Sequence, residues 1–167
     1  MPPVLLYDLN AVDLTQRLYT REQIYAKLPH RFEFQHLDAI VHVDREAEVA
    51  IALREVRTDE WWVRGHVPGQ PIFPGVLMLE TAAHLAAFMT KYIYDYRGFV
   101  AFGGVDNCKF RDAVIPPARI YMICHQIENK SRRIAADCQA VVNDKLVFEA
   151  EITGLPLAGG SSQSLNR

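Results

Sequence analysis

A loop rich in proline and glycine, followed directly by an apolar run, constrains this chain more than any other feature. Five Pro and Gly residues lie between positions 68 and 75, a density that a helix or a central strand does not tolerate. About fifteen residues follow from Val76, with Glu80 and His84 as their only strongly polar side chains. A helix that is apolar on all sides belongs in a protein core. We therefore predict one long buried helix that begins near Val76, directly after the loop.

The loop and the helix together suggest a functional site. Glu80 and His84 lie four residues apart and share one face of the predicted helix, and we expect the loop to place His66 close to them. Titratable groups in apolar surroundings at a helix N-terminus suit proton transfer next to a developing oxyanion. The alternative is a pair of hydrogen-bonded structural histidines and a carboxylate paired with a cation. The coincidence of this loop with the only acid on the helix favours a functional site.

The rest of the sequence predicts a single α+β domain. The chain has 167 residues, of which 50% are hydrophobic, enough for one soluble domain with a sizeable core. Alternation of apolar and polar residues predicts strands at 49–53, 99–105, 118–128, 133–142 and 146–153. Asn143 and Asp144 suit a tight hairpin turn between the last two strands. One buried helix among antiparallel strands predicts a curved sheet wrapped around that helix.

The ends of the chain differ from this central domain. Residues 1–20 form an N-terminal extension of mixed composition, to which we assign no function. Thr20 and Gln23 form a capping box that predicts a short helix from about Arg21 to Lys27. The domain then extends over residues 21–157, and the composition of residues 158–167 predicts a flexible tail.

Composition argues against several classes of function. The net charge of -2 and the lack of a basic run disfavour a nucleic-acid-binding protein. The apolar run is too short to span a bilayer, and Glu80 would be costly in lipid, so we expect no membrane insertion. The first residues lack a secretory pattern. Three cysteines without close metal-binding spacing favour reduced thiols, and we expect a cytoplasmic protein.

The segment Gly65–Glu80 resembles a known family signature. The FabZ type of 3-hydroxyacyl-[acyl-carrier-protein] dehydratase, within the FabA/FabZ group, carries Gly-His-Phe-Pro-Gly-x-Pro-x-Met-Pro-Gly-Val-Leu-x-x-Glu. This chain departs from it only at Val67 and Phe73. The FabA branch has Asp at the helix position, so Glu80 favours the FabZ type. The resemblance covers roughly residues 23–155 and implies the hotdog fold, in which a curved antiparallel sheet wraps a long central helix.

The resemblance also implies a reaction. It is the dehydration of (3R)-3-hydroxyacyl-ACP to trans-2-enoyl-ACP in the biosynthesis of fatty acids or of related lipids and polyketides. His66 would be the base that removes the C2 proton, and Glu80 the acid, with a pKa raised by an apolar tunnel. The N–H of Gly75 would polarise the thioester carbonyl. No cofactor is implied. His66, Glu80 and His84 are suitable metal ligands, but the elimination needs no metal.

Further residues receive roles from the same resemblance. Phe73 and Val76 are expected to bind substrate next to Gly75. The family commonly has Gln where this chain has His84. This histidine either hydrogen-bonds Glu80 or fills the polar position of the Gln, and the second alternative is favoured.

Two further pairs of residues are candidates for a role outside the reaction itself. Lys109 and Arg111 are candidates for docking the acidic helix of an acyl carrier protein, the alternative being solvated surface. His30 and Arg31 lie in a segment that resembles the family's Leu-Pro-His-Arg sequence, and we interpret them as a structural loop.

The implied partners are an acyl carrier protein with a 4'-phosphopantetheine-linked acyl chain and a second copy of the chain. In the family, the His and the Glu of one site come from opposite subunits, which implies a homodimer, and many relatives form trimers of dimers. Two other functions remain open. One is a hotdog acyl-thioester hydrolase, which would not need the Gly-His loop. The other is a non-catalytic acyl-binding hotdog protein, which would normally have lost His66 or Glu80.

Overall fold

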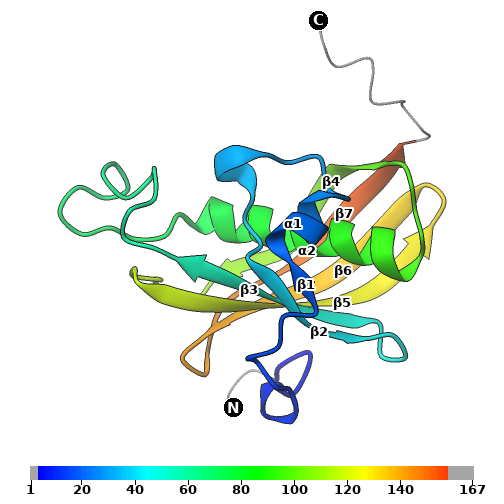
Figure 1. Cartoon of the computed structure of the whole chain (residues 1–167), viewed down its shortest axis with the longest axis horizontal. Coiled ribbons are helices and arrows are strands. Elements are labelled where there is room, and N and C mark those ends of the chain that lie inside the picture. Colours follow the sequence, from blue (N-terminus) through cyan, green and yellow to red (C-terminus); the bar gives the residue numbers. More distant parts are fainter. Residues whose placement is uncertain (1–3, 158–167) are drawn as a thin grey trace, which may run out of the picture.

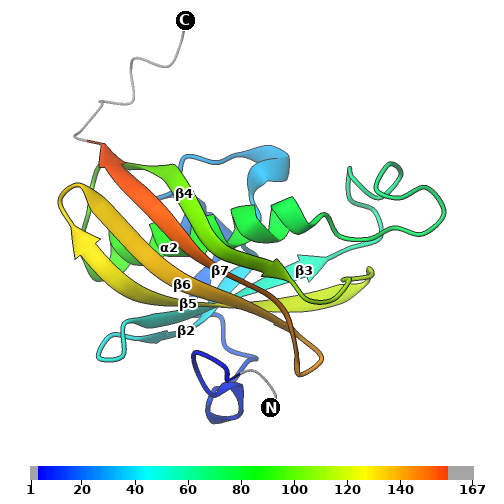
Figure 2. The same cartoon turned by 180° about the vertical axis from the view of Figure 1, so that it is seen from behind.

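A computed structural model describes residues 4–157, in which one long helix lies in the hollow of a curved sheet (Figure 1). The helix is α2, Gly75–Ile93. The strands of the sheet are β1 (Tyr19–Thr20), β2 (Ala39–Asp44), β3 (Val49–Val56), β4 (Phe99–Phe110), β5 (Ala118–Lys130), β6 (Arg133–Val142) and β7 (Lys145–Leu157). Their order is β1-β2-β3-β5-β6-β7-β4, and all neighbouring strands are antiparallel (Figure 2). This confirms the predicted α+β class and hotdog arrangement.

Helix α2 begins directly after Pro74, close to the predicted start, and extends to Ile93. Its side chains pack against the concave face of the sheet. Leu85, Phe88 and Met89 are fully buried there. Removal of such side chains from water stabilises a fold by about 1.5–3 kcal/mol each. The helix is therefore held along its length by apolar packing, which gives Glu80 and His84 fixed positions.

The N-terminal extension covers the opposite, outer face of the sheet. Apolar residues of this segment pack on a second buried cluster; they are Leu5, Leu6, Tyr7, Leu9, Val12 and Leu14. The cluster beneath includes Ile51, Leu53 and Ile123, which alternate along β3 and β5 with residues that face α2. The Gln139 side chain anchors the segment, because its Oε1 accepts the Leu6 N–H at 2.8 Å and its Nε2 donates to the Val4 carbonyl at 3.2 Å.

The two shorter helical segments are η1 (Leu9–Ala11) and η2 (Phe32–Phe34), and α1 spans Arg21–Tyr25. The capping box predicted for α1 is confirmed, because the Thr20 side chain accepts the Gln23 N–H and Gln23 reaches back to Thr20. The helix ends two residues before the predicted Lys27. Asn143 and Asp144 both have positive φ, 47° and 61°, as a tight hairpin turn of the predicted kind requires. The predicted tail, residues 158–167, lies outside the described residues.

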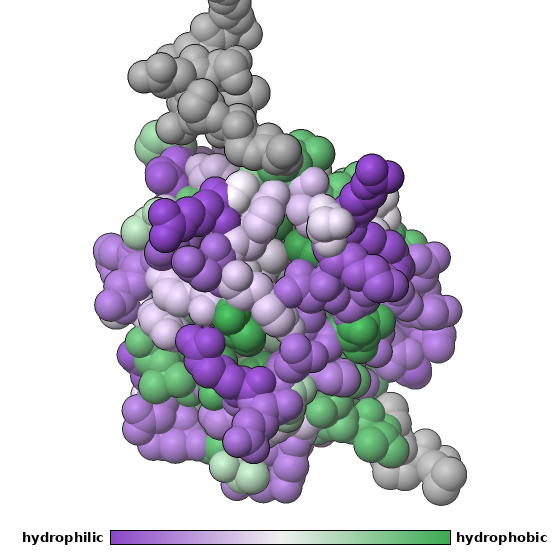
Figure 3. All heavy atoms as spheres, turned by 90° about the vertical axis from the view of Figure 1, so that its right-hand side faces the viewer, coloured by the Kyte–Doolittle hydropathy of each residue, from purple (hydrophilic) through white to green (hydrophobic). Residues whose placement is uncertain are grey.

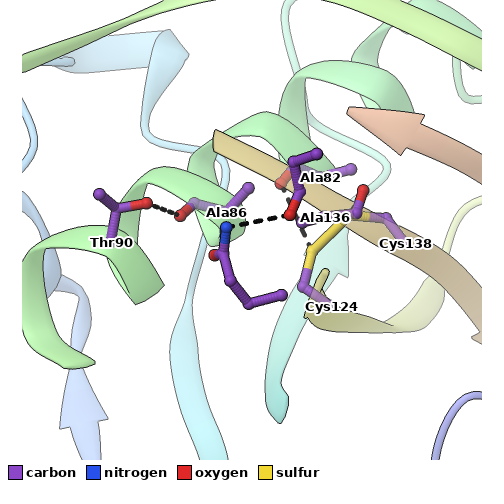
Figure 4. The surroundings of a disulfide bond; sticks show 8 residues. Ala82, Ala86, Thr90, Cys124, Ala136 and Cys138 are labelled. Carbon is purple, nitrogen blue, oxygen red and sulfur yellow. Dashed lines mark hydrogen bonds between the residues drawn. A yellow bond between two sulfur atoms is a disulfide. The ribbon is translucent and has the colours of Figure 1, made fainter. Parts of the chain in front are cut away.

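The expectation of reduced thiols is wrong for two of the cysteines. Cys124 on β5 and Cys138 on β6 form a disulfide that lies against α2 (Figure 4). The two residues are direct partners in the strand register, with Cα atoms 4.4 Å apart. Their separation of 14 residues along the chain does not reveal this register. Among the described residues Cys108 is the free cysteine.

Within residues 4–157, no helix combines the length and the apolar character needed to cross a bilayer. At the end of the molecule where α2 finishes, apolar residues occur in separate small areas among polar ones (Figure 3).

Candidate active site

A cavity of about 150 Å³ lies between α2 and the edge of the sheet formed by β4 and β7. His30, Glu80 and His84 line its polar end. The remaining wall is mostly apolar and includes Ala83, Ala86, Ala87, Val100 and Ile152. Small residues on one face of α2 leave this space open, because alanine side chains are short. The cavity therefore joins one carboxyl and two imidazoles to a narrow apolar compartment.

Glu80 and His84 form a direct hydrogen bond at the polar end. His84 Nε2 lies 3.0 Å from Glu80 Oε1, as their spacing of one helical turn allows. The His84 ring is 1% exposed, and its Nδ1 lies 2.9 Å from the Tyr25 hydroxyl. The alternative that was favoured, in which His84 only fills a polar position, is therefore wrong. The imidazole binds the Glu80 carboxyl directly.

His30 is a cavity residue that the sequence interpretation missed. Its ring stacks on His84 with centroids 3.8 Å apart, and its Nε2 lies 3.9 Å from Glu80 Oε1. Arg31 fits the structural interpretation, since its guanidinium donates to the carbonyls of Tyr25, Leu28 and His30 and holds this loop in place. The loop thus presents His30 to the site. The match of this segment to the family's Leu-Pro-His-Arg sequence was the feature of the sequence that could have identified His30 as a residue of the site.

The ionisation of the cluster differs from the prediction. The hydrogen bond from His84 lowers the pKa of Glu80, and the nearby imidazoles add to this, against the opposing effect of burial. The expected rise above the usual value is therefore wrong. Burial lowers the pKa of His30 and of His36 to about 4 each, so both are neutral near pH 7. At neutral pH the cavity holds the Glu80 carboxylate with the neutral His30 imidazole beside it.

His66 does not reach this cavity within one chain. It lies on the loop between β3 and α2, which extends away from the rest of the molecule (Figure 1). The side chain is exposed and does not line the cavity. Its Nδ1 lies 2.7 Å from the Ile72 carbonyl, so Nδ1 carries the hydrogen and donates it. Nε2 of the neutral ring is then a free acceptor, as a general base requires.

A buried ion pair supports the base of the His66 loop. The Arg54 side chain is 6% exposed and pairs with Glu60, which is equally buried. Trp62 Nε1 donates to Glu60 Oε2 at 3.0 Å. The guanidinium also lies over the Phe73 ring, 5.3 Å from its centroid. The first and last parts of the loop are thus tied to β3.

The residues predicted to surround the thioester carbonyl lie at the start of α2. Gly75 is the first helical residue, and within residues 4–157 its N–H donates to no acceptor. A Cβ at this position would lie 2.8 Å from the Phe110 ring, so only glycine fits without a shift. Val76 is 67% exposed. Phe73 is 1% exposed and packs on Trp62, so its side chain belongs to the core of this chain.

The two basic residues proposed for carrier docking share one acidic partner. Lys109 Nζ and Arg111 Nη2 lie 3.2 Å and 2.6 Å from Glu149 Oε1 on β7. The hydrogen bond from Arg111, with help from Lys109, lowers the pKa of Glu149. Together, Lys109, Arg111 and Glu149 carry one net positive charge at the surface.

One set of potential metal ligands occurs among the described residues, and it differs from the set considered above. Donor atoms of His30, Glu80 and His84 lie within 4.8 Å of one another, and His66 is not among them. His84 Nε2, which would have to ligate, already faces Glu80 Oε1 at hydrogen-bond distance. Glu80 and His84 are thus hydrogen-bonded to each other, whereas the His30 Nε2 lies 3.9 Å from Glu80 Oε1 and the buried His30 Nδ1 has no partner among the described residues.

Comparisons with known proteins assign the sequence to one family. The FabA-like domain matches residues 28–151, a span that contains the loop, α2 and the cavity residues named above except Ile152. The chain belongs to the FabA-like family. A 3-hydroxyacyl-[acyl-carrier-protein] dehydratase FabZ from Lawsonia intracellularis is 35% identical over 136 residues, which cover 79% of this chain and 88% of the relative. The FabZ of Saccharophagus degradans is 32% identical over 134 residues, or 78% and 92% of the two chains.

Solved structures share the fold at low sequence identity. The dehydratase heterocomplex ApeI:P from Xenorhabdus doucetiae superposes with a TM-score of 0.70 at 10% identity, covering 84% of this chain and 93% of that chain. A mutant thioesterase from Pseudomonas aeruginosa gives 0.63 at 17% identity, covering 87% and 100%. At these identities the likeness shows the fold alone.

Proposed function

We propose that this protein is a hydro-lyase that dehydrates (3R)-3-hydroxyacyl-ACP to trans-2-enoyl-ACP in fatty acid biosynthesis. The observation that carries the proposal is the cavity, which has the Glu80 carboxyl at its polar end and an apolar compartment behind it. The family membership and the dehydratase relatives support the same reaction. The acyl chain occupies the apolar compartment, and the C2 and C3 atoms lie next to Glu80.

The protonation states favour a division of roles that differs from the sequence-based expectation. His66 Nε2 accepts the proton from C2, and the C3–O bond breaks as the double bond forms. Because Glu80 is ionised, it accepts a hydrogen bond from the C3 hydroxyl and orients it. The proton on His66 then passes to the departing oxygen, which leaves as water. The Gly75 N–H stabilises the enolate oxygen, and one such donor is typically worth about 2.7–4 kcal/mol of barrier.

A homodimer completes the proposed site. His66 lies outside the cavity of its own chain, so a second copy must supply it. Strand β4 forms one edge of the sheet and exposes Phe99, Phe102 and Phe110. An edge strand of this length with apolar side chains is a template for pairing with another chain. We propose that two chains associate along β4, and that such dimers can assemble further to trimers of dimers.

The acyl carrier protein is the proposed partner that delivers the substrate. Its 4'-phosphopantetheine group carries the acyl chain to the cavity. Lys109 and Arg111 remain candidates for its docking surface. Their shared partner Glu149 weakens this surface, which leaves one net positive charge for an acidic helix.

The test is an assay of the purified protein with 3-hydroxybutyryl-ACP as substrate. The absorbance of the enoyl thioester measures the formation of product. We expect the wild-type protein to form the enoyl product and His66→Ala to lose about 10²–10⁴ in rate, as removal of a general base typically does. Because the proposed site places His66 at the contact between two chains, native mass spectrometry should check that the variant keeps the oligomeric state of the wild type. Release of free thiol without enoyl product would instead indicate a thioesterase, and binding without turnover a non-catalytic acyl-binding protein.

A further inference from the structure

Three hydrogen bonds in series connect the backbone before β2 to the carboxyl of Glu80. The Leu37 N–H donates to the Tyr25 hydroxyl at 2.8 Å. The same hydroxyl lies 2.9 Å from His84 Nδ1, and His84 Nε2 lies 3.0 Å from Glu80 Oε1. Tyr25 belongs to α1 and is 3% exposed, while His84 belongs to α2. The series therefore joins α1 and α2 through fully enclosed groups.

The donor and acceptor groups of Tyr25, His84 and Glu80 determine which atom donates in each of these hydrogen bonds. Burial raises the pKa of Tyr25, so its hydroxyl keeps its hydrogen. Because the oxygen already accepts the Leu37 N–H, its hydrogen has His84 Nδ1 as its partner among the described residues. Nδ1 is then the acceptor, and the ring hydrogen sits on Nε2 and is donated to Glu80. The opposite tautomer would place two lone pairs against each other at the Glu80 contact.

We propose that Tyr25 is a positioning residue that acts on Glu80 through His84. By accepting from the backbone and donating to His84, it fixes the imidazole in the form with hydrogen on Nε2. That form holds Glu80 by Oε1 and leaves Oε2 to receive the substrate hydroxyl. The inference deepens the proposed function and rests on it for the role of Oε2.

Other charged or titratable groups face Glu80 from two directions. His30, on the loop after α1, lies 3.9 Å away from Oε1. His36, on the segment before β2, has its ring 5.5 Å from that of His84. Both histidines lower the pKa of Glu80, but less than the hydrogen bond from His84 does. The hydrogen bond from His84 is therefore the largest influence on the pKa of this carboxyl.

The first test uses the wild-type protein, so it does not depend on any variant folding. Nitrogen-15 NMR of the histidine side chains, assigned with His84→Gln, reports which ring nitrogen carries hydrogen. We expect His84 to show a protonated Nε2 and an unprotonated, hydrogen-bonded Nδ1 near neutral pH. A protonated Nδ1, with or without hydrogen on Nε2, would overturn the proposal.

The second test removes only the hydroxyl, with Tyr25→Phe. We expect both tautomers of His84 to appear and the carbon-13 titration of the Glu80 carboxyl to move to higher pH. We also expect kcat to fall by about 10–100-fold with little change in KM, by analogy with the loss caused by removing the partner that orients a metal-bound histidine. A folded variant with unchanged His84 resonances and an unchanged Glu80 titration would contradict the proposal.

A matched control separates positioning from stability. The Tyr92 hydroxyl on α2 donates to the Gln23 carbonyl of α1 at 3.0 Å, so it links the same two helices without touching His84. Tyr92→Phe should leave the His84 resonances, the Glu80 titration and kcat unchanged, and equal shifts in both variants would overturn the proposal. The NMR readouts need no turnover. If the protein lacks dehydratase activity, they still decide the role of Tyr25, and the proposed function fails separately.

Discussion

At Glu80, two effects of opposite sign act on one carboxyl. Burial alone would raise its pKa, but the hydrogen bond from His84 and the nearby imidazoles lower it below the usual 4.5. Glu80 is therefore ionised at any pH near neutrality. A group with a depressed pKa cannot supply a proton at neutral pH, so its substitution should change the rate without removing a basic limb from the pH profile.

We therefore expect Glu80→Gln to lose most of its activity, because the amide can donate a hydrogen bond but carries no negative charge to hold the substrate hydroxyl. The shape of the pH dependence of kcat/KM should be the same in both proteins. The measurement is the profile of the wild type and of the residual activity of the variant. A basic limb near neutral pH that disappears in Glu80→Gln would return the role of acid to Glu80.

His36 offers a second prediction, which concerns stability. Its pKa is lowered from 6.5 to about 4 in the folded protein, chiefly by burial. Between these values the unfolded chain binds a proton that the folded chain does not, so stability falls as the pH falls from 6.5 to 4. His36→Gln should reduce the slope of unfolding free energy against pH by about one proton, roughly 1.4 kcal/mol per pH unit. Urea unfolding across this range measures it, and an unchanged slope would mean that His36 is not the linked group.

At the level of elements, the loop that carries His66 depends on the buried pair of Arg54 and Glu60. Glu60→Ala leaves a guanidinium buried without its closest partner, and we expect a loss of about 3 kcal/mol in unfolding free energy. This value is the lower end of the usual loss for breaking a buried ion pair, because Asp38 remains 3.9 Å from the Arg54 guanidinium.

The matched control for this prediction is Asp59→Ala. Asp59 pairs with Arg57 in the same loop, but both side chains are more than half exposed, at 77% and 51%. An exposed pair contributes about 0–1 kcal/mol. Urea unfolding should therefore separate the two variants clearly. Equal losses would show that Arg54 does not need Glu60.

The elements with local signals were predictable from the sequence. The start of α2 followed from proline, glycine and an apolar run, and the cap of α1 from Thr20 and Gln23. The pairing of Cys124 with Cys138 was not predictable, because it depends on the register of two strands. The bond between His84 and Glu80 was considered but not favoured. The same ring contacts the Tyr25 hydroxyl, which is 59 residues away along the chain, and no local sequence pattern reveals that contact.

For the whole molecule, the position of His66 leads to a test of the shared site. Mixing inactive His66→Ala with inactive Glu80→Gln subunits should restore activity after subunit exchange. Each heterodimer then contains one intact pair and one doubly altered pair. Native mass spectrometry establishes that heterodimers have formed. If they form and remain inactive, both residues act within one chain and the proposed site is wrong.

The hydrogen bonds of Gln139 to the N-terminal segment have a practical consequence for immobilising or labelling the protein. They hold Val4 on the outer face of the sheet, away from α2. At the other end of the described residues, Leu157 pairs with Phe99, a residue of the cavity wall. A tag, dye or surface linker joined ahead of Val4 therefore starts on the face opposite the cavity, whereas one joined after Leu157 starts beside the cavity. Immobilisation or labelling should use the amino terminus.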